Sequence, residues 1–282
     1  MKPAPGCGGA YISPRPGCYV FAMRFELHCH SVCSDGTEAP EAVAKRARDR
    51  GVDVFALTDH DTCAGSAAAG GIRAVEISCD EAGRSVHLLA YARGGTFAAI
   101  EDRLAALREA RRNRMRVMGA KLAQRGIRID VEPMIEAAER EGRTIGRPDL
   151  ARAMIAHGAA TSMKDAFNRF LYDGGPVDVP HRALTLAAAV ELGREAGAAL
   201  SLAHPHLYNP SLLRTHRGIE GVEAYYGVYD PKERTRWLEV ADELGLVCTG
   251  GSDWHGADDA TCEPGVELPA ERAERLVRWL GL

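Results

Sequence analysis

The chain has 282 residues, of which 46% are hydrophobic and 26% charged, as in an ordinary soluble globular protein. Its formal net charge of −4 argues against a broadly basic surface that coats nucleic acid, but not against a small anionic substrate. No apolar run approaches the roughly 18 residues of a membrane span, which argues against a membrane protein.

The eight cysteines form no CxxC pair, and several fall inside strand-like runs where a free thiol packs as a small hydrophobe. This usage favours a reduced, cytoplasmic protein over a disulfide-stapled secreted one. Residues 1–22 are rich in Gly and Pro and lack the basic start and apolar centre of a signal peptide. We expect them to be a disordered N-terminal extension, or translation to begin at Met23.

Between residues 23 and 97, short β-rich runs alternate with a helical pattern, which predicts parallel βα units. A helix is expected near 38–50. The expected strands are 25–30, 53–58, 72–78 and 85–91.

Residues 98–182 follow a different pattern and are predicted to form a helical insertion domain. Apolar residues recur at helical spacing from Leu104 to Leu122, and Gly126 ends the run. Shorter helices are expected to follow. They lie near 131–141, 148–157 and 161–172.

The βα pattern resumes over residues 183–282, which are predicted to complete the domain begun by 23–97. Together the two segments contain seven expected strands, and their length fits a (β/α) barrel. The later strands are expected at 198–203, 219–226 and 246–251, and the later helices at 185–196, 231–244 and 270–280.

Six of the ten histidines and three carboxylates lie at the ends of these strand-like runs or within them. Residues i and i+2 of an extended strand point to the same face, so His28 can act with His30, and Asp253 with His255. Nitrogen and carboxylate donors in this number suit two or three divalent ions such as Zn, Mn or Fe. The candidate ligands are His28, His30, Asp35, His60, Glu76, His87, His204, Asp253 and His255.

Taken together and in this order, the motifs resemble those of the PHP (polymerase and histidinol phosphatase) family of metal-dependent phosphoesterases. Within the insertion, Gly146-Arg147-Pro148 resembles the subgroup of 3′,5′-nucleoside bisphosphate phosphatases and short-oligoribonucleotide 5′-to-3′ exonucleases. The motifs are HCH at 28–30, SDG at 34–36, LTDHDT at 57–62, VEIS at 75–78, AHP at 203–205 and GSDWH at 251–255.

The resemblance implies a distorted seven-stranded barrel, a three-metal cluster and hydrolysis of a phosphate ester by metal-bound hydroxide. One ion would take His28, His30, Glu76 and Asp253. A second would take Glu76 as a bridging ligand with His87 and His204, and a third Asp35, His60 and His255. Asp59, Asp61 and a metal-bound water are candidates for the acid that protonates the leaving group. Glu223 is a candidate for orienting a ligand.

Two departures from the subgroup affect the residues expected to bind substrate. Asp149 stands where the subgroup usually has a histidine after Gly-Arg-Pro. His206-Leu207 stand where it has Gly-Arg, so a bidentate phosphate contact is lost. We expect Arg147 and His206 to compensate in part, and Asp149 to weaken the binding of a second phosphate.

The predicted function is therefore hydrolysis of a nucleotide-like phosphate ester, either a 3′,5′-nucleoside bisphosphate or a short 5′-phosphorylated RNA, with no obligate protein partner. A cyclic phosphate diesterase and a histidinol-phosphate-type phosphatase are alternatives within the family. An amidohydrolase is disfavoured because no lysine lies in a later strand motif to bridge the metals. A non-catalytic metal-binding module is disfavoured because none of the nine ligands is missing.

Overall fold

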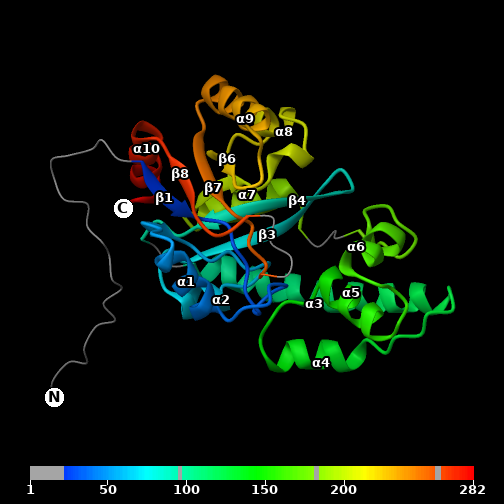
Figure 1. Ribbon diagram of the computed structural model, residues 1–282. Helices are drawn as coiled ribbons and strands as arrows, with labels where there is room; N and C mark the ends of the chain where they lie inside the picture. The colour runs from blue at the N-terminus through cyan, green and yellow to red at the C-terminus, as the bar shows by residue number, and fades with distance from the viewer. Residues whose placement is uncertain (1–21, 95–96, 181–183, 258–261) are drawn as a thin grey trace, which may run out of the picture.

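The computed structural model describes residues 22–94, 97–180, 184–257 and 262–282. The expected N-terminal extension therefore lies almost entirely outside the described residues. The described chain is of mixed α/β type, with its strands divided between two sheets and a group of helices to one side (Figure 1). The α/β class is thus confirmed. A single closed seven-stranded barrel is not shown, since these strands pair as a three-stranded and a five-stranded sheet.

The smaller sheet has β1 (Met23–Glu26) at its centre. It pairs in parallel with β2 (Val54–Phe55) and antiparallel with β8 (Val266–Leu268). Strand β8 was not expected from the sequence, where Pro264 and Gly265 obscure so short a run. Strands β1 and β2 end earlier than predicted, so the histidines that follow β1 lie in a loop.

The larger sheet runs in the order β3 (Ala74–Glu81), β4 (Arg84–Tyr91), β5 (Ala199–Leu202), β6 (Gly221–Tyr226), β7 (Val247–Gly251). The prediction of parallel units throughout is wrong here, because β3–β4 and β4–β5 are antiparallel. Ala82 and Gly83 join β3 to β4 with φ values of 51° and 83°. Two positive φ values are typical of a type I′ hairpin turn, which needs no crossover helix.

The two sheets also contact each other through backbone hydrogen bonds that lie outside their regular strand pairs. The Leu27 amide donates to the Gly250 carbonyl at 3.1 Å, and single parallel bridges join Cys29 to Trp254 and His60 to Glu76. These contacts bring the ends of β1, β2, β3 and β7 to one region of the molecule. Polar side chains that follow those strands are thereby gathered together.

The outer helices pack on the sheets through a continuous core that includes Phe25, Leu89, Val222 and Trp237. Local sequence signals account for their ends. In α9, for example, Asp230 caps the N-terminus by accepting from the Lys232 and Glu233 amides, and Gly245 ends the helix at φ 66°. The helices are α1 (Pro40–Asp49), α2 (Ala64–Ala69), α7 (Leu186–Glu195), α8 (Ser211–Thr215), α9 (Pro231–Leu244) and α10 (Ala270–Leu280).

The inserted segment has a core of its own. Its helices lie beside the sheets, in green in Figure 1, and bury a second cluster that includes Met115, Ile135, Leu150 and Leu171. The long helix α3 joins the two, because its first half packs into the main core through Leu104 and its second half into the other. The inserted helices are α3 (Ala98–Ala123), α4 (Glu132–Arg140), α5 (Arg147–Ala156), α6 (Met163–Ala166) and the π-helical turn Phe167–Leu171.

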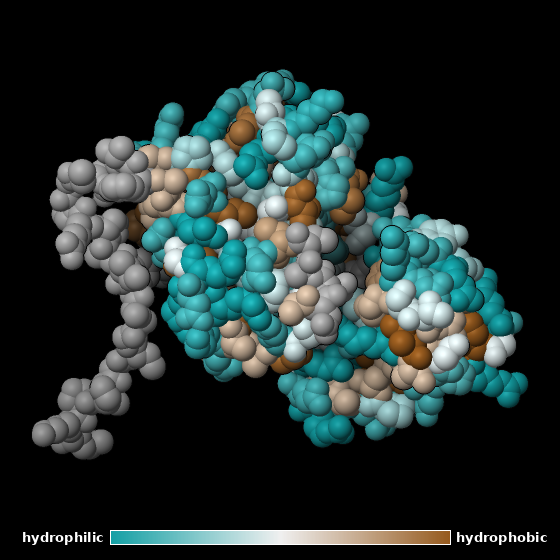
Figure 2. Space-filling model, in the orientation of Figure 1, coloured by the Kyte–Doolittle hydropathy of each residue, from teal (hydrophilic) through white to brown (hydrophobic). Residues whose placement is uncertain are grey.

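Hydrophilic residues cover most of the face seen in Figure 2, and hydrophobic ones there form small separate groups. In the described part of the chain, no helix is both long and apolar enough to cross a membrane.

Candidate metal centre

The loop after β1 brings two buried histidines to the region where the strands converge. His28 and His30 are completely buried, as is the intervening Cys29, which packs in a separate cluster with Trp254. The loop keeps its shape because the His30 amide donates to the Trp254 carbonyl at 2.8 Å and the Asp253 amide to the His28 carbonyl at 2.7 Å. The HxH and DxH motifs are thus hydrogen-bonded to each other.

Glu76, on strand β3, lies at the middle of the histidine side chains and is only 1% exposed. Its two carboxylate oxygens are divided between five rings. Oε2 lies 3.4 Å from His28 Nε2, 3.2 Å from His30 Nε2 and 3.0 Å from His60 Nδ1, while Oε1 lies 2.9 Å from His87 Nδ1 and 3.1 Å from His204 Nε2. A carboxylate shared in this way is suited to bridge two ions.

Asp253 extends the group on the side of His28 and His30. Its Oδ1 lies 3.2 Å from His28 Nε2 and 3.1 Å from His30 Nε2. The Tyr226 hydroxyl donates to the other oxygen at 2.9 Å and so fixes the plane of the carboxylate.

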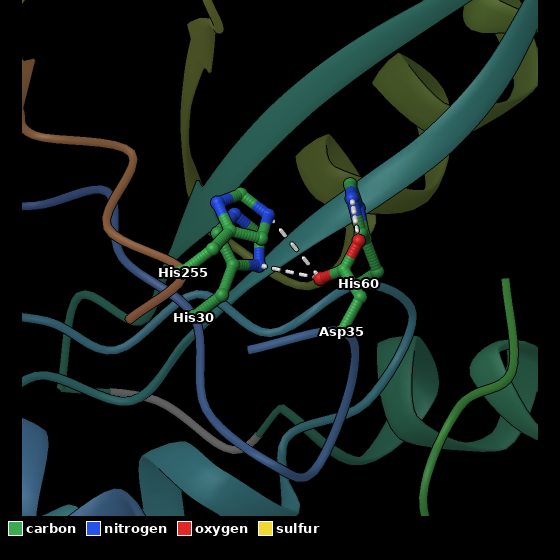
Figure 3. A group of neighbouring side chains, drawn as sticks. All are labelled: His30, Asp35, His60 and His255. Atoms are coloured by element: carbon green, nitrogen blue, oxygen red, sulfur yellow. Dashed lines mark ion pairs between the residues drawn. The ribbon is translucent and has the colours of Figure 1, made fainter. Parts of the chain in front are cut away.

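Asp35 collects the remaining ring nitrogens. Figure 3 shows His30, His60 and His255 directed toward its carboxylate. Oδ1 lies 3.3 Å from His255 Nε2 and 3.6 Å from His30 Nδ1, and Oδ2 lies 3.6 Å from His60 Nε2. These four residues form a second, more open group beside the one around Glu76.

Glu223, on β6, supports the centre from behind. Its carboxylate accepts from His28 Nδ1 at 3.0 Å and from the His204 amide at 2.7 Å. A hydrogen bond at Nδ1 leaves Nε2 of His28 with its lone pair directed toward Glu76 and Asp253. Tyr208 lies on the other side, where its hydroxyl accepts from the His87 amide at 3.2 Å.

The carboxylates are ionised despite their burial. Desolvation favours the neutral acid, but His60, His87 and His28 hold the pKa of Glu76 well below its usual range. The same opposition of burial and imidazole charge keeps the pKa values of Asp35 and Asp253 well below normal.

Four buried polar atoms in this centre make no hydrogen bond to any described residue. They are His28 Nε2, His30 Nε2, His60 Nδ1 and Glu76 Oε2, and the nitrogens lie only 3.0–3.4 Å from that oxygen. Buried polar groups are normally satisfied, so atoms that converge without bonding one another call for a cation between them. The donor set of imidazoles and carboxylates fits Zn, Mn or Fe.

All nine predicted ligands belong to groups of donor atoms close enough to hold an ion, with every pair in a group within 4.8 Å. The groups overlap at His28, His30, His60 and Glu76, as expected where ions share ligands. They are His30–Asp35–His60–His255, His28–His30–Asp253, His28–Glu76–His204 and His60–Glu76–His87.

Asp59 and Asp61 lie next to the centre but are directed into the surrounding structure. Asp59 is fully buried and accepts from the Ser31 amide at 2.7 Å and the Ser34 hydroxyl at 2.6 Å. Asp61 accepts from Arg111 Nε at 2.6 Å and from the Ser78 amide at 2.8 Å. The first carboxylate shapes the loop that carries Asp35, and the second joins α3 to β3.

The three predicted substrate-binding residues are not brought to one place. Arg147 contacts Asp173 at 2.5 Å and the Leu171 carbonyl at 2.9 Å, within the insertion. His206 stacks on Tyr226 with ring centroids 5.6 Å apart and lies near His204. Asp149 caps α5 by accepting from the Gly146 amide at 2.8 Å.

Asp149 also lines a cavity of about 470 Å³ between residues 32–36 and 141–152. Arg143 and Arg152 line the same cavity, and neither was among the residues predicted to bind substrate. Tyr226, Tyr208 and Ser34 were missed as well. Their roles depend on which backbone or carboxylate each hydroxyl reaches, and no local motif encodes this.

Comparisons with known proteins agree with this geometry. The family model described as the PHP domain matches residues 26–141. The chain is 29% identical to the 5′-3′ exoribonuclease Rnm of Escherichia coli strain K12, over 83% of this chain and 86% of that protein. It is 30% identical to a 3′,5′-nucleoside bisphosphate phosphatase of Chromobacterium violaceum, over 82% and 86%. It is also 30% identical to a phosphoribosyl 1,2-cyclic phosphate 1,2-diphosphodiesterase of Eggerthella lenta, over 87% and 99%.

Two solved structures are similar over nearly the whole chain. One is described as a metal-dependent phosphoesterase from Bifidobacterium adolescentis, with a TM-score of 0.79 and 28% identity over 90% of this chain and 96% of that one. The other is described as an amidohydrolase from Chromobacterium violaceum with bound sulfate and no metal, with a TM-score of 0.77 and 29% identity over 89% and 96%.

Proposed function

Because the chain belongs to the PHP domain family and is a metal-dependent phosphoesterase, we propose that its substrate is a nucleotide-like phosphate ester. The candidates are a 3′,5′-nucleoside bisphosphate and a short oligoribonucleotide. The relatives named as a bisphosphate phosphatase and as exoribonucleases support this choice. The observation that carries the chemistry is the convergence of unbonded buried atoms around Glu76 Oε2.

We propose the following division of ligands among two or three ions. His28, His30, Glu76 and Asp253 hold one, Glu76 with His87 and His204 a second, and Asp35, His60 and His255 a third. When bound, the ions would neutralise phosphoryl oxygens and lower the pKa of a water that acts as nucleophile. The protein's share is to hold the ligands in place, which Glu223 does for His28 and His204, and Tyr226 for Asp253.

Proton transfer to the leaving group was assigned to Asp59 or Asp61, and that assignment stays a prediction. Both carboxylates are occupied by strong hydrogen bonds, Asp59 with two serines and Asp61 with Arg111 and Ser78. This arrangement supports positioning roles for both. His206 lies beside His204. Burial lowers the pKa of the His206 side chain, and the neighbouring His204 ring lowers it further.

The finer architecture is also part of this proposal. The bridges between the two sheets support a distorted barrel closed by side-chain and isolated backbone contacts. The separate core of the helical segment supports an insertion domain over 98–182. All six cysteines among the described residues are free, which supports a reducing compartment.

A cyclic phosphate diesterase is the second candidate, favoured by a specific observation. The Eggerthella lenta relative with that name is matched over 99% of its length. That relative is named for a cyclic phosphodiester, so the two candidates differ in the scissile group, which is a ring diester in one and a monoester or an open-chain diester in the other.

Phosphate release by the Mn(II)-loaded protein tests the proposal. The substrates are adenosine 3′,5′-bisphosphate, AMP, a five-membered cyclic phosphate and a short 5′-phosphorylated oligoribonucleotide, with His28→Ala as the inactive comparison. Turnover of the bisphosphate or the oligonucleotide that His28→Ala abolishes supports the nucleotide assignment. Turnover of the cyclic ester alone supports the second candidate, and no turnover of any ester contradicts both.

A further inference from the structure

The cavity beside Asp35 adjoins the metal centre directly. Ser34 lines it with its hydroxyl oxygen 3.2 Å from Asp35 Oδ1, and Arg152 lines it and donates through Nη2 to the Asp35 carbonyl at 2.6 Å. Its 470 Å³ is enough for a nucleoside-sized group. A substrate whose phosphate lies at the residues of Figure 3 would extend its neighbouring group into this space.

Two arginines give the cavity its hydrogen-bond donors. Arg143 uses Nη1 for Asp149 Oδ1 at 3.0 Å and Nε for Glu141 Oε2 at 3.0 Å. Arg152 Nη1 lies 3.7 Å from the same Asp149 oxygen. A guanidinium has five N–H donors, so both arginines retain donors beyond these contacts. The two arginines are balanced by the carboxylates of Asp149 and Glu141, so the formal charge of the cavity lining is zero.

This charge balance is built into the fold. Asp149 is held at both oxygens, by Arg143 and by the Gly146 amide at 2.8 Å, and its side chain is 10% exposed. The segment itself is fixed to the metal centre by Thr144, whose amide donates to the Cys33 carbonyl at 2.8 Å and whose hydroxyl donates to the His60 carbonyl. Asp149 therefore cannot leave the cavity without uncapping α5.

We propose that this cavity receives the group next to the scissile phosphate, and that Asp149 and Glu141 restrict it to a group with at most one negative charge. The inference rests on the proposed phosphoesterase function and narrows its substrate. A terminal phosphate carries about −1.5 to −2 at pH 7. A phosphodiester carries one charge and a sugar hydroxyl none, so the favoured substrate is a short oligonucleotide or nucleoside phosphate without an additional terminal phosphate.

A pair of dinucleotides that differ by one terminal phosphate tests this. The Mn(II)-loaded full chain is assayed on ApA and on 5′-phosphorylated pApA, and the ratio of kcat/KM for pApA over ApA is measured. We expect a ratio of one or less for the wild type. Asp149→Asn should raise the ratio roughly tenfold, because it removes one negative charge while keeping an oxygen for the Gly146 amide. Arg143→Gln should lower it.

Arg112→Gln is the matched control for Arg143→Gln. Arg112 is also an insertion arginine paired with a glutamate, and its side chain is 17% exposed against 19% for Arg143, but it does not line the cavity. Glu141→Gln is the second test variant, since the Glu141 side chain is 56% exposed and its loss does not touch the helix cap. It should raise the ratio in the same direction as Asp149→Asn.

The outcomes distinguish a failure of the proposed phosphoesterase function from a failure of the cavity assignment. Bis(p-nitrophenyl) phosphate reports metal-dependent hydrolysis without a second charged group. If neither it nor any dinucleotide is hydrolysed, the proposed function fails. If it is hydrolysed but the dinucleotides are not, the cavity assignment is overturned. The same holds if the wild-type ratio is above one, or if the cavity variants keep the wild-type ratio.

Discussion

The metal centre and the adjoining cavity are built from opposite kinds of contact. The centre consists of buried side chains on strand ends and the loops beside them, where Glu76 is 1% exposed and His28 is fully buried. The cavity is lined by partly exposed ion pairs from the insertion, with Arg152 40% exposed. Burial fixes the donors for chemistry common to many esters. Exposed charges, whose interactions are weak and easily altered, are suited to setting specificity.

The largest difference between the two regions should appear on removing the central carboxylate. Glu76→Gln keeps the shape of the side chain but removes the charge shared by five histidines. We expect phosphoesterase activity to fall about a thousandfold or more, together with loss of bound metal measured by elemental analysis. Glu81→Gln, near the end of the same strand and paired with His216, is the control. Full activity in Glu76→Gln would show that the centre lies elsewhere.

The contact between insertion and sheet should matter for stability more than any cavity residue. Arg111 is 8% exposed and pairs with the fully buried Asp61, so Arg111→Met removes the guanidinium from a buried carboxylate. We expect the free energy of unfolding in urea to fall by about 3–5 kcal/mol. Arg116→Met, which breaks the exposed pair between Arg116 on the same helix and Glu132 on α4, should change it by less than about 1 kcal/mol. Equal losses in the two variants would refute the distinction.

Weakening the hydrogen bonds that Glu223 makes to the metal ligands should reduce activity less than replacing Glu76 itself. Glu223→Gln weakens the hold on His28 Nδ1 and on the His204 amide without removing a donor atom from the ions. We expect metal affinity to fall about 10–100-fold, with activity recovered at high Mn(II) concentration. Glu239→Gln, on the exposed face of α9, serves as the comparison. Activity that excess metal does not restore would argue that Glu223 has a different role.

The smallest effect concerns thiol access to the cavity. Burial raises the pKa of Cys248 to about 11, so at pH 8 it stays protonated and shielded. Burial raises the pKa of Cys33 too, but Cys33 is half-buried and lines the cavity. Iodoacetamide followed by peptide mass mapping should modify Cys33 several times faster than Cys248. Equal rates would mean that the cavity is closed in solution.

Much of the metal centre could be predicted from the sequence. The HxH spacing placed His28 with His30, which share one group of donor atoms with Asp253. Glu76 lies in one group with His28 and His204 and in another with His60 and His87. Glu76 and His87 lie inside β3 and β4, where Glu76 pairs with Leu89 and His87 with Ser78. The two ligands are therefore neighbours across the hairpin, although its strands were expected to be parallel.

What the sequence determined by itself was the class of fold, the donor set and hence the family's chemistry, because these depend on residue type and local spacing. The tertiary structure decided how charges pair across long separations. It pairs Asp61 with Arg111 and Asp59 with two serines. It also places Asp149 beside Arg143 and Arg152. Long flexible side chains can reach many partners, so only the packed fold selects which ones they contact.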